Sequence, residues 1–432
     1  MLELDTIRDP EALRRLAPEW QALMARAGPP ATIFQSYDWA AACMAELEPG
    51  RQLCVLTARD HGRLVAIAPL MRDRQIGFAT LRWLGGSLAI YGDVLADDRV
   101  DVPAWLRRAL DQLTAQGEAH SLLLDNVRAD ARVAPFLGDI GRKSGSKSAP
   151  WIDLETLGTF EVWRARQSRA TRRSRARRLK RLEAAGAVSF RFERAGSIDS
   201  QHAVPRLAEL FAMKRDWAEG RHVISRTIHA PAFEAIVGAL VTGKSCLDAR
   251  LSVLLLDGKA ISIELGFVVG RVYISYLGAY DPRFEAFSPG LLQLERTLEA
   301  CFAEGLEAFD LQPPADAYKL SLACDAVPVS GYAAALTSLG RIHTTVAAVD
   351  PVGLAKSAIG LMPDSCRRLV YSAVQVMSGP STTERPASLS GAKPEPGAVP
   401  DAASPRPAMS PLVRRLLILL GAGAAVAAIV AD

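Results

Sequence analysis

The stretch YISYLGAYDPRFEAFSPGLLQLERTLEACFAEGLEAFDLQPPADAYK, residues 273–319, decides the fold of this chain. An apolar and aromatic strand over 272–279 opens it, and a loop rich in polar residues follows. The pattern then predicts a helix over 291–304 and a short apolar strand over 308–311. Strand, loop, helix and strand in this order are typical of an α/β unit.

The helix start in this stretch has the chemistry of a phosphate site. Helix N-termini expose unpaired N–H groups and the positive end of the helix dipole. Gly290 permits a close backbone approach to a ligand, Ser288 can cap the helix, and Leu291 begins it. Pro289 lacks an N–H group and removes one donor. The alternative interpretation is an ordinary Ser-Pro-Gly helix start without a ligand.

Further strands precede this unit, over 249–256 and 260–269. Glu264 lies in the second of them, and a carboxylate in an apolar strand has a raised pKa that suits a general base. Strict alternation along the strand leaves a surface position as its alternative. Tyr273 and Tyr276 differ in parity, so at most one of them can face a catalytic cleft and protonate a leaving group. Aromatic packing is the alternative for each.

The chain shows weak internal symmetry, because the order of helices and strands before residue 150 recurs after it. We expect an α/β (α+β) protein with two lobes of one kind, each with a mixed central sheet. The loop GRKSGSKSAP at 141–150 marks the boundary between a lobe at 1–149 and a lobe at 150–346. An irregular or helical extension is expected at 347–378.

A second composition change follows near the end of the sequence. Residues 379–411 are rich in Pro, Ser, Ala and Gly and predict a disordered linker. Residues 412–432 form a hydrophobic tail in which Arg414 and Arg415 precede sixteen uncharged residues. This tail is at the lower length limit for a membrane span, so a short anchor in the inner membrane and a helix packed on a surface both remain open.

Composition excludes several classes of protein. The chain has 432 residues, of which 49 % are hydrophobic, and a net charge of +4. Its six cysteines are scattered without a nearby histidine cluster, which argues against a metal site and against a disulfide framework. The N-terminus lacks the pattern of a secretory signal, so a cytoplasmic protein is expected.

The positive charge is concentrated in one segment. Ten of the eighteen residues from Arg164 to Arg181 are Arg or Lys, and Arg172 and Arg173 lie at its centre. On a helix these cations spread around most faces, which does not predict a one-sided stripe. Electrostatic binding of a cofactor, an anionic acceptor or a membrane surface is one interpretation, and a solvated structural helix is another. Nucleic-acid binding is disfavoured because no aromatic partners accompany the arginines.

Taken together, these motifs resemble the CelD/BcsL-like acetyltransferases of the GNAT superfamily, which are associated with cellulose and exopolysaccharide operons. The resemblance is carried by Gly278 to Pro282, Ser288 to Gly290, Phe309-Asp310 and Tyr318-Lys319, and it extends to FQSYDWAAAC in the first lobe. It implies tandem GNAT-like lobes and direct attack of an amine on an acyl-CoA thioester, with acetyl-CoA or a longer acyl-CoA as co-substrate and no metal.

The resemblance also implies roles for individual residues. Glu264 would be the base and Tyr276 the acid; Arg172 and Arg173 would join Ser288, Gly290 and Leu291 in binding the cofactor. Trp217, Asp310, Tyr318 and Lys319 would line the acceptor site, with a structural ion pair, a turn or core packing as their alternatives. Gln312-Pro313-Pro314 replaces a loop that in the family more often contains glycine, which puts the geometry of this loop in doubt.

Three functions follow as hypotheses. The first is acyl-CoA-dependent N-acyl transfer to an amino group on a sugar, lipid or small molecule, in envelope polysaccharide or lipid biosynthesis. The second is aminoacyl transfer from charged tRNA, as in the distantly related FemAB-type transferases, with the basic helix contacting RNA. The third is a non-catalytic GNAT-like scaffold of a polysaccharide-secretion system.

Overall fold

The computed structural model describes residues 2–28, 31–75, 77–195, 200–220, 230–242 and 245–347. The expectations for the extension beyond residue 347, the linker and the hydrophobic tail lie outside these residues. Within them, no helix is long and apolar enough to cross a membrane.

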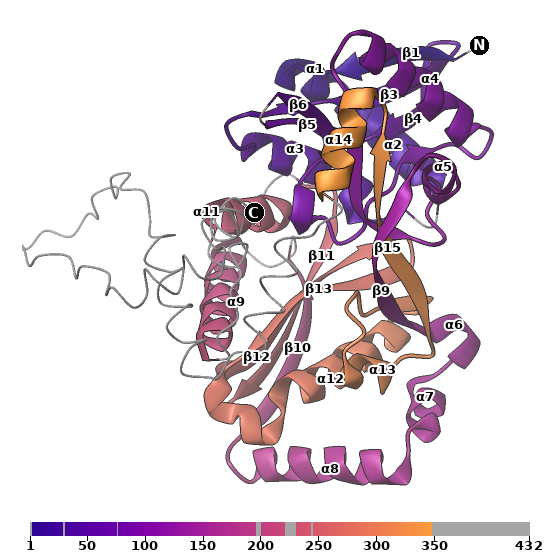
Figure 1. Ribbon diagram of the computed structural model, residues 1–432. Coiled ribbons are helices and arrows are strands. Elements are labelled where there is room, and N and C mark those ends of the chain that lie inside the picture. Colours follow the sequence, from indigo (N-terminus) through magenta and orange to yellow (C-terminus); the bar gives the residue numbers. More distant parts are fainter. Residues whose placement is uncertain are drawn as a thin grey trace, which may run out of the picture. The chain divides into compact units, whose positions relative to one another are not determined.

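The first lobe begins with a strand and three helices and continues with short strands (Figure 1). Its elements are β1 (Glu3–Ile7), α1 (Pro10–Arg15), α2 (Ala17–Ala27), α3 (Tyr37–Ala45), β2 (Arg51–Leu53), β3 (Val55–Asp60), β4 (Arg63–Ala68), β5 (Leu70–Gln75), β6 (Phe78–Trp83), β7 (Leu95–Ala96), α4 (Val102–Ala115), β8 (Ser121–Arg128), α5 (Ala134–Ile140) and β9 (Arg142–Asp153). Side chains of Asp9, Ser36 and Asp101 cap three of the helices by accepting backbone N–H groups.

The second lobe contains the basic helix and the stretch that decides the fold. Its elements are α6 (Leu154–Leu157), α7 (Phe160–Arg166), α8 (Arg169–Glu183), β10 (Val188–Arg194), α9 (Ser200–Gly220), α11 (Pro231–Thr242), β11 (Asp248–Leu256), β12 (Lys259–Val269), β13 (Val272–Tyr280), the 3-10 helix η3 (Pro282–Phe287), α12 (Pro289–Ala303), β14 (Ala308–Asp310), α13 (Ala317–Leu320), β15 (Asp325–Ala335) and α14 (Ser338–Ala347). The strands and the helix expected between residues 249 and 311 are confirmed within two residues at each end.

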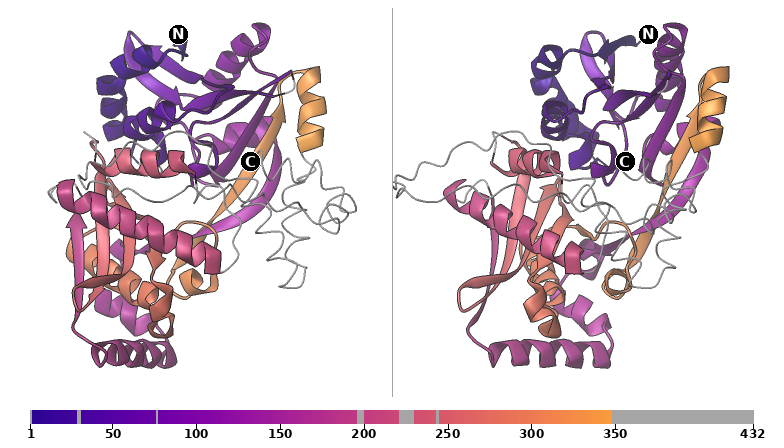
Figure 2. Two further views of the ribbon diagram at one scale, coloured as in Figure 1. Left: turned by 90° about the vertical axis from the view of Figure 1, so that its left-hand side faces the viewer. Right: turned by 60° about the vertical axis from the view of Figure 1, so that its left-hand side comes forward.

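One mixed sheet runs through both lobes. Its eleven strands follow the order β10-β11-β12-β13-β14-β9-β15-β8-β6-β5-β2, and a smaller sheet has the order β1-β3-β4-β7. The pairs β13–β14 and β6–β8 are parallel, and the other neighbours are antiparallel. Strand β15, late in the chain, lies between β9 and β8 of the first lobe (Figures 1 and 2). The two lobes therefore share backbone hydrogen bonds.

The expected loop at 141–150 is wrong, because residues 142–150 belong to strand β9. The first seven residues of β9 are exposed or half-buried, so no apolar alternation reveals a strand there. Pairing with β15, from Ala333 opposite Arg142 to Asp325 opposite Trp151, imposes the extended conformation instead. The placement of a domain boundary near residue 149 stays a prediction.

Candidate active site

Glu264 lies in the middle of β12 and is buried, with 6 % of its surface exposed. Its Oε1 accepts a hydrogen bond from the Tyr273 hydroxyl at 2.8 Å, and its Oε2 accepts one from the Ser275 hydroxyl at 3.0 Å. The surface alternative for Glu264 is therefore wrong. Polar and apolar residues do alternate along β12, as the sequence suggested. The polar side of the strand is nevertheless not on the surface, because helix α12 packs against β12.

The surroundings of Glu264 make it a weak acid and a usable base. Burial raises its pKa from the ordinary 4.5 to about 7, although the Tyr273 and Ser275 hydroxyls and the charge of Lys319 act in the opposite direction. A carboxyl group with a pKa near the operating pH can take up a proton from an ammonium ion and release it again. Burial thus gives Glu264 a raised pKa, as the sequence predicted, and its role as a general base stays a prediction.

A β-bulge in β13 arranges the side chains around this carboxyl group. Leu265 pairs with Leu277 while the next residue, Gly266, pairs with Ser275, so Tyr276 is the extra residue. Beyond the bulge, Gly278 lies opposite Glu264 in the β12–β13 register. No apolar pattern in the sequence indicates such an insertion, and the bulge was not predicted.

Tyr276 points away from Glu264, into an aromatic group. Its ring lies 5.9 Å from that of Phe34, 6.4 Å from that of Trp39 and 5.7 Å from that of Phe267. Burial raises the pKa of its hydroxyl. The expected opposition of Tyr273 and Tyr276 is what the structure shows, but it is Tyr273 that contacts Glu264. The two residues expected to work as base and acid are therefore not brought together.

The parallel pairing of β13 with β14 is short. It covers three residue pairs and ends at Ile274 opposite Asp310, while β13 continues to Tyr280. Beyond that point the Gly278 carbonyl oxygen accepts a hydrogen bond from Lys214 Nζ at 3.1 Å. Gly278 itself is exposed.

Two lysines lie near this part of β13. Lys214 comes from α9, with its Nζ 5.0 Å from the centre of the Trp217 ring. Burial lowers the pKa of Lys214, and the positive charge of Lys319 lowers it further. Burial also lowers the pKa of Lys319, against the effect of nearby carboxylates that include Glu264. The structure thus brings Trp217, Lys319 and Glu264 into one neighbourhood. Sequence reasoning missed Lys214, three residues before Trp217 on the same helix.

Asp310 forms hydrogen bonds to residues of the first lobe and does not face solvent. It is buried and accepts hydrogen bonds from the Tyr91 hydroxyl at 2.8 Å and from Arg128 Nη1 at 3.2 Å, both in the first lobe. The backbone N–H of Gln312 donates to it at 2.7 Å. Burial raises the pKa of Asp310, although these donors oppose the shift. This geometry matches the structural alternative for Asp310.

Gln312 is a second residue that sequence reasoning did not single out as functional. It has a positive φ of 59° and is only 4 % exposed. Its carbonyl oxygen accepts a hydrogen bond from Lys319 Nζ at 2.9 Å. Its side-chain Nε2 is buried and has no hydrogen-bond partner among the described residues. Native structures rarely leave such a donor unsatisfied, so Gln312 is a candidate contact for a ligand oxygen. Tyr318, one residue before Lys319, is 48 % exposed.

The start of α12 offers fewer phosphate donors than its sequence suggests. Ser288 is in the left-handed conformation with a φ of 54°, and its side chain does not cap the helix. The N–H groups of Leu291 and Leu292 both donate to the Ser288 carbonyl oxygen. A Cβ on Gly290 would lie 3.3 Å from the Tyr280 ring, so this glycine allows the helix to approach β13. Its N–H group stays a candidate phosphate donor.

The basic helix α8 packs beside this helix start. Arg181 lies over the Phe287 ring of η3, 5.4 Å from its centre. Arg175 is buried, pairs with Glu295 of α12 at 3.5 Å and lies over the Trp163 ring. The expected cofactor residues Arg172 and Arg173 are exposed, in the half of α8 farther from Arg181. Arg181 is therefore the cation of α8 that the structure places against the loop before α12.

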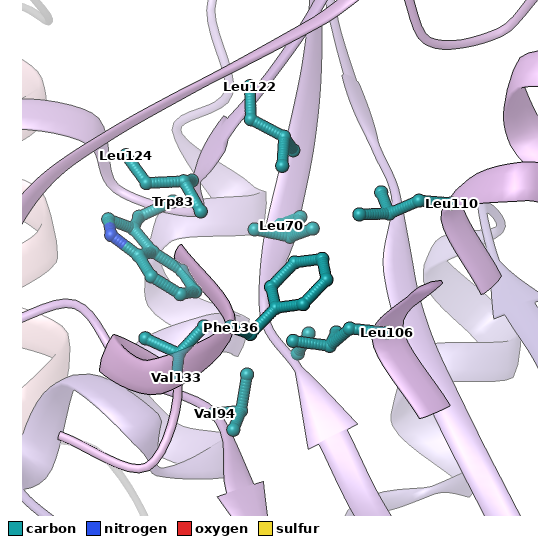
Figure 3. Close-up of a pocket in the computed structure, with 10 residues that line it drawn as sticks. Leu70, Trp83, Val94, Leu106, Leu110, Leu122, Leu124, Val133 and Phe136 are labelled. Carbon is teal, nitrogen blue, oxygen red and sulfur yellow. The ribbon is translucent and has the colours of Figure 1, made fainter. Parts of the chain in front are cut away.

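The first lobe contains a small cavity in its core (Figure 3). Its volume is about 10 Å³, which is at most room for one water molecule. Ten apolar side chains line it, among them Leu70, Trp83 and Phe136. This cavity is a packing defect and not a ligand site. Among the described residues, no group of three or more His, Cys, Asp or Glu is placed to hold a metal ion.

Comparison with known proteins identifies the fold. Residues 169–320 match the family model of the Acetyltransferase (GNAT) domain. FemX resembles the chain with a TM-score of 0.52 and 14 % identity, over 77 % of this chain and 97 % of that one. A tandem GNAT protein from the clavulanic acid biosynthesis pathway has a TM-score of 0.43 and 15 % identity, over 78 % of this chain and 98 % of that one. L-PGS from Bacillus licheniformis has a TM-score of 0.46 and 12 % identity, over 79 % and 96 %.

No curated protein matches the sequence. The chain is a mixed α/β protein whose residues 169–320 match an acetyltransferase (GNAT) domain, and its fold resembles that of FemX over most of its length. The predicted fold class is therefore confirmed.

Proposed function

We propose that this protein is an acyl-CoA-dependent N-acyltransferase. The observation that carries the proposal is the buried Glu264 carboxyl group, whose pKa is about 7. It lies beside the exposed backbone of Gly278. Gly278 is in the part of β13 beyond the residues that pair with β14. A transferase for amines needs a proton acceptor of this strength within reach of bound substrates. The family match of residues 169–320 supports the reaction class.

In the proposed reaction the acceptor amine attacks the thioester carbonyl carbon. A C–N bond forms, the C–S bond breaks, and CoA leaves as a thiolate. The amine loses one proton to Glu264, which is held in place by Tyr273 and Ser275. The leaving thiolate then gains a proton. Holding both substrates together contributes much of the rate enhancement in such a transfer. Tyr276 does not lie beside the base, so we assign the protonation of the thiolate to no residue.

The residues before and along α12 fit the phosphates of an acyl-CoA in part. Gly290 contributes one N–H group at a helix start, and Arg181 of α8 contributes a cation that lies over Phe287 just before this helix. We retain Arg172 and Arg173 as weaker, exposed contributors. Pro289 and the internal bonds of Leu291 and Leu292 limit the backbone donors, so binding depends more on arginine than in a helix start with free amides.

The acceptor is proposed to enter beside Lys214, Lys319 and Trp217. The ammonium groups of the two lysines attract anionic groups, although burial lowers the pKa of both side chains. An amine carried on a phosphorylated sugar or on a lipid with a phosphate headgroup would match this charge. Buried donors such as Gln312 Nε2 can bind a hydroxyl or carbonyl oxygen of the same molecule.

Calorimetry with acetyl-CoA and with longer acyl-CoAs tests the donor side. We expect measurable binding of at least one of them. The Glu264→Gln variant should keep that affinity and lose roughly 10²–10⁴-fold in turnover, which is the usual contribution of a general base. Exposed Glu183→Gln is the matched control. If no acyl-CoA bound, or if turnover required charged tRNA, the proposal would be wrong.

A further inference from the structure

The exposed side of α8 is a continuous stripe of cations. Seven positions spaced i, i+3, i+4, i+7, i+8, i+11 and i+12 from residue 169 are all exposed, and this spacing follows one face of a helix. Six of the seven are basic, with Ala176 as the exception: Arg169, Arg172, Arg173, Arg177, Lys180 and Arg181. The cations do spread around most faces of α8, as expected, but Arg175 and Arg178 outside the stripe are buried and half-buried, so the exposed cations lie on one side.

The contacts of α8 show which side of the helix packs against the rest of the lobe. Arg175 and Leu182 are its buried residues, and Arg175 pairs with Glu295 of α12. Leu182 belongs to a core cluster with Leu254 and Ile261 of the sheet. The helix is therefore fixed to the lobe along one side, and the stripe stands on the other. In all three views of Figures 1 and 2, α8 is the outermost element at one end of the described residues.

The stripe is not neutralised by the protein itself. None of its six cations forms an ion pair with a described residue, and the only acidic residue of α8 is Glu183 at its end. The stripe spans about 18 Å along the helix at 1.5 Å per residue. The exposed row therefore concentrates positive charge on one side of α8, where it attracts anionic partners.

We propose that this stripe docks the protein on the surface of an anionic lipid bilayer. A bilayer presents many phosphates on one side, which matches a straight, one-sided row of cations on a helix whose other side is fixed. The stripe has no aromatic side chain on which a base could stack, which makes single-stranded nucleic acid a poorer match. The apolar tail sequence after Arg415 adds a second feature that suits a bilayer. The stripe shares Arg172, Arg173 and Arg181 with the proposed cofactor site, whereas Arg169, Arg177 and Lys180 belong to the stripe alone.

Sedimentation of the full chain with lipid vesicles tests the proposal. One vesicle contains equal parts of phosphatidylglycerol and phosphatidylcholine, and the other contains phosphatidylcholine alone. The difference between the two isolates the electrostatic contribution from any contribution of the tail. The test variant carries Arg169→Gln, Arg177→Gln and Lys180→Gln. The control carries Arg74→Gln, Arg99→Gln and Arg108→Gln, three exposed residues of the first lobe with the same change in net charge.

We expect the wild type and the control to bind the anionic vesicles, with affinity falling as salt is added. The test variant should lose roughly a hundredfold in affinity, at about one kilocalorie per mole for each cation near the surface. Equal binding of test variant and control would overturn the proposal. So would tighter binding of the wild type to a tRNA probe than to anionic vesicles at the same salt, with loss in the test variant. Circular dichroism on heating confirms that both variants are folded.

Discussion

Gly278 lies directly opposite Glu264 across the β12–β13 ladder, and a Cβ placed on Gly278 would stand 3.8 Å from Glu264 Oε2. The glycine is exposed and the carboxyl group is buried, and any side chain at position 278 would contact this carboxyl group. The pair links the geometry of the bulge to the proposed chemistry.

A larger side chain at position 278 should impair the proposed reaction without unfolding the protein. The φ of Gly278 is not positive and its Cβ position is in ordinary contact, so Gly278→Val should change the free energy of unfolding by less than about 1 kcal/mol. We expect kcat/KM to fall about a hundredfold, because the substrate is displaced from the base. Gly278→Ala should give a smaller loss. Unchanged kcat/KM in both variants would place the reaction elsewhere.

The activity should depend on pH through Glu264. The base must be ionised to accept a proton, and burial sets its pKa at about 7. We expect kcat/KM to rise with pH up to about 7 and then to level off. Ser275→Ala removes one hydrogen bond that stabilises the ionised form, so the midpoint should move to higher pH. A midpoint that is identical in both proteins would argue against Glu264 as the titrating group.

The free energy of unfolding should also depend on the ionisation of Glu264. It should fall as pH rises, whereas the activity should increase. The folded pKa of about 7 exceeds the ordinary 4.5, so between these values the folded state holds a proton that the unfolded chain has lost. Stability is therefore greatest below the lower value, falls as pH rises through the window, and stays reduced above it. Glu264→Gln removes this dependence and should gain on the order of 3 kcal/mol relative to the wild type at alkaline pH. Urea unfolding of both proteins at acidic and alkaline pH measures the difference.

Gln312 should matter for binding more than for folding. Its Nε2 has no described hydrogen-bond partner, so replacing the amide by the similarly shaped Leu costs no hydrogen bond from this atom. We expect Gln312→Leu to keep the unfolding midpoint or to raise it, while KM for the acceptor increases about tenfold. Asp310→Asn, which disturbs the contacts with Tyr91 and Arg128, should lower the midpoint and serves as the structural comparison. Loss of stability without a change in KM in Gln312→Leu would remove it from the site.

The two halves of α8 should differ in their effect on acyl-CoA binding. Arg181 lies over Phe287, next to the start of α12, whereas Arg172 stands near the other end of the helix. Arg181→Gln should raise the Kd for acetyl-CoA several-fold, as expected for the loss of one phosphate contact, and Arg172→Gln should raise it less. Calorimetry gives both values. The reverse order would restore Arg172 as the principal cofactor contact.

Sequence patterns predicted the second lobe well because its signals are local. Turns at Asp257-Gly258 and at Gly270 bound three strands of apolar residues, and the helix after Pro289 follows its own periodicity. The exposed half of β9 carries no such signal, since its conformation comes from pairing with residues 180 to 191 positions later in the chain, from Ser148 opposite Pro328 to Arg142 opposite Ala333. Long-range pairing is invisible to local propensity.

The sequence indicated which residues could form the candidate site, but it did not indicate how they are arranged. Glu264 was recognisable as a carboxylate in an apolar strand, yet the bulge at Tyr276 depends on how β13 pairs with β12. The stripe on α8 shows the same limit. Its helix is evident from the sequence, but the exposed face is known only once Arg175 is seen to be buried.

The insertion of β15 between β9 and β8 has a consequence for how the chain is made. The sheet of the first lobe lacks a central strand until residues 325–335 are available to pair. During synthesis on the ribosome, the first lobe must therefore wait with its β8 and β9 edges open while the entire second lobe emerges. Unpaired strand edges invite association with other chains, and pairings distant in sequence form slowly. A newly made chain stalled before residue 325 would be a natural client for chaperones.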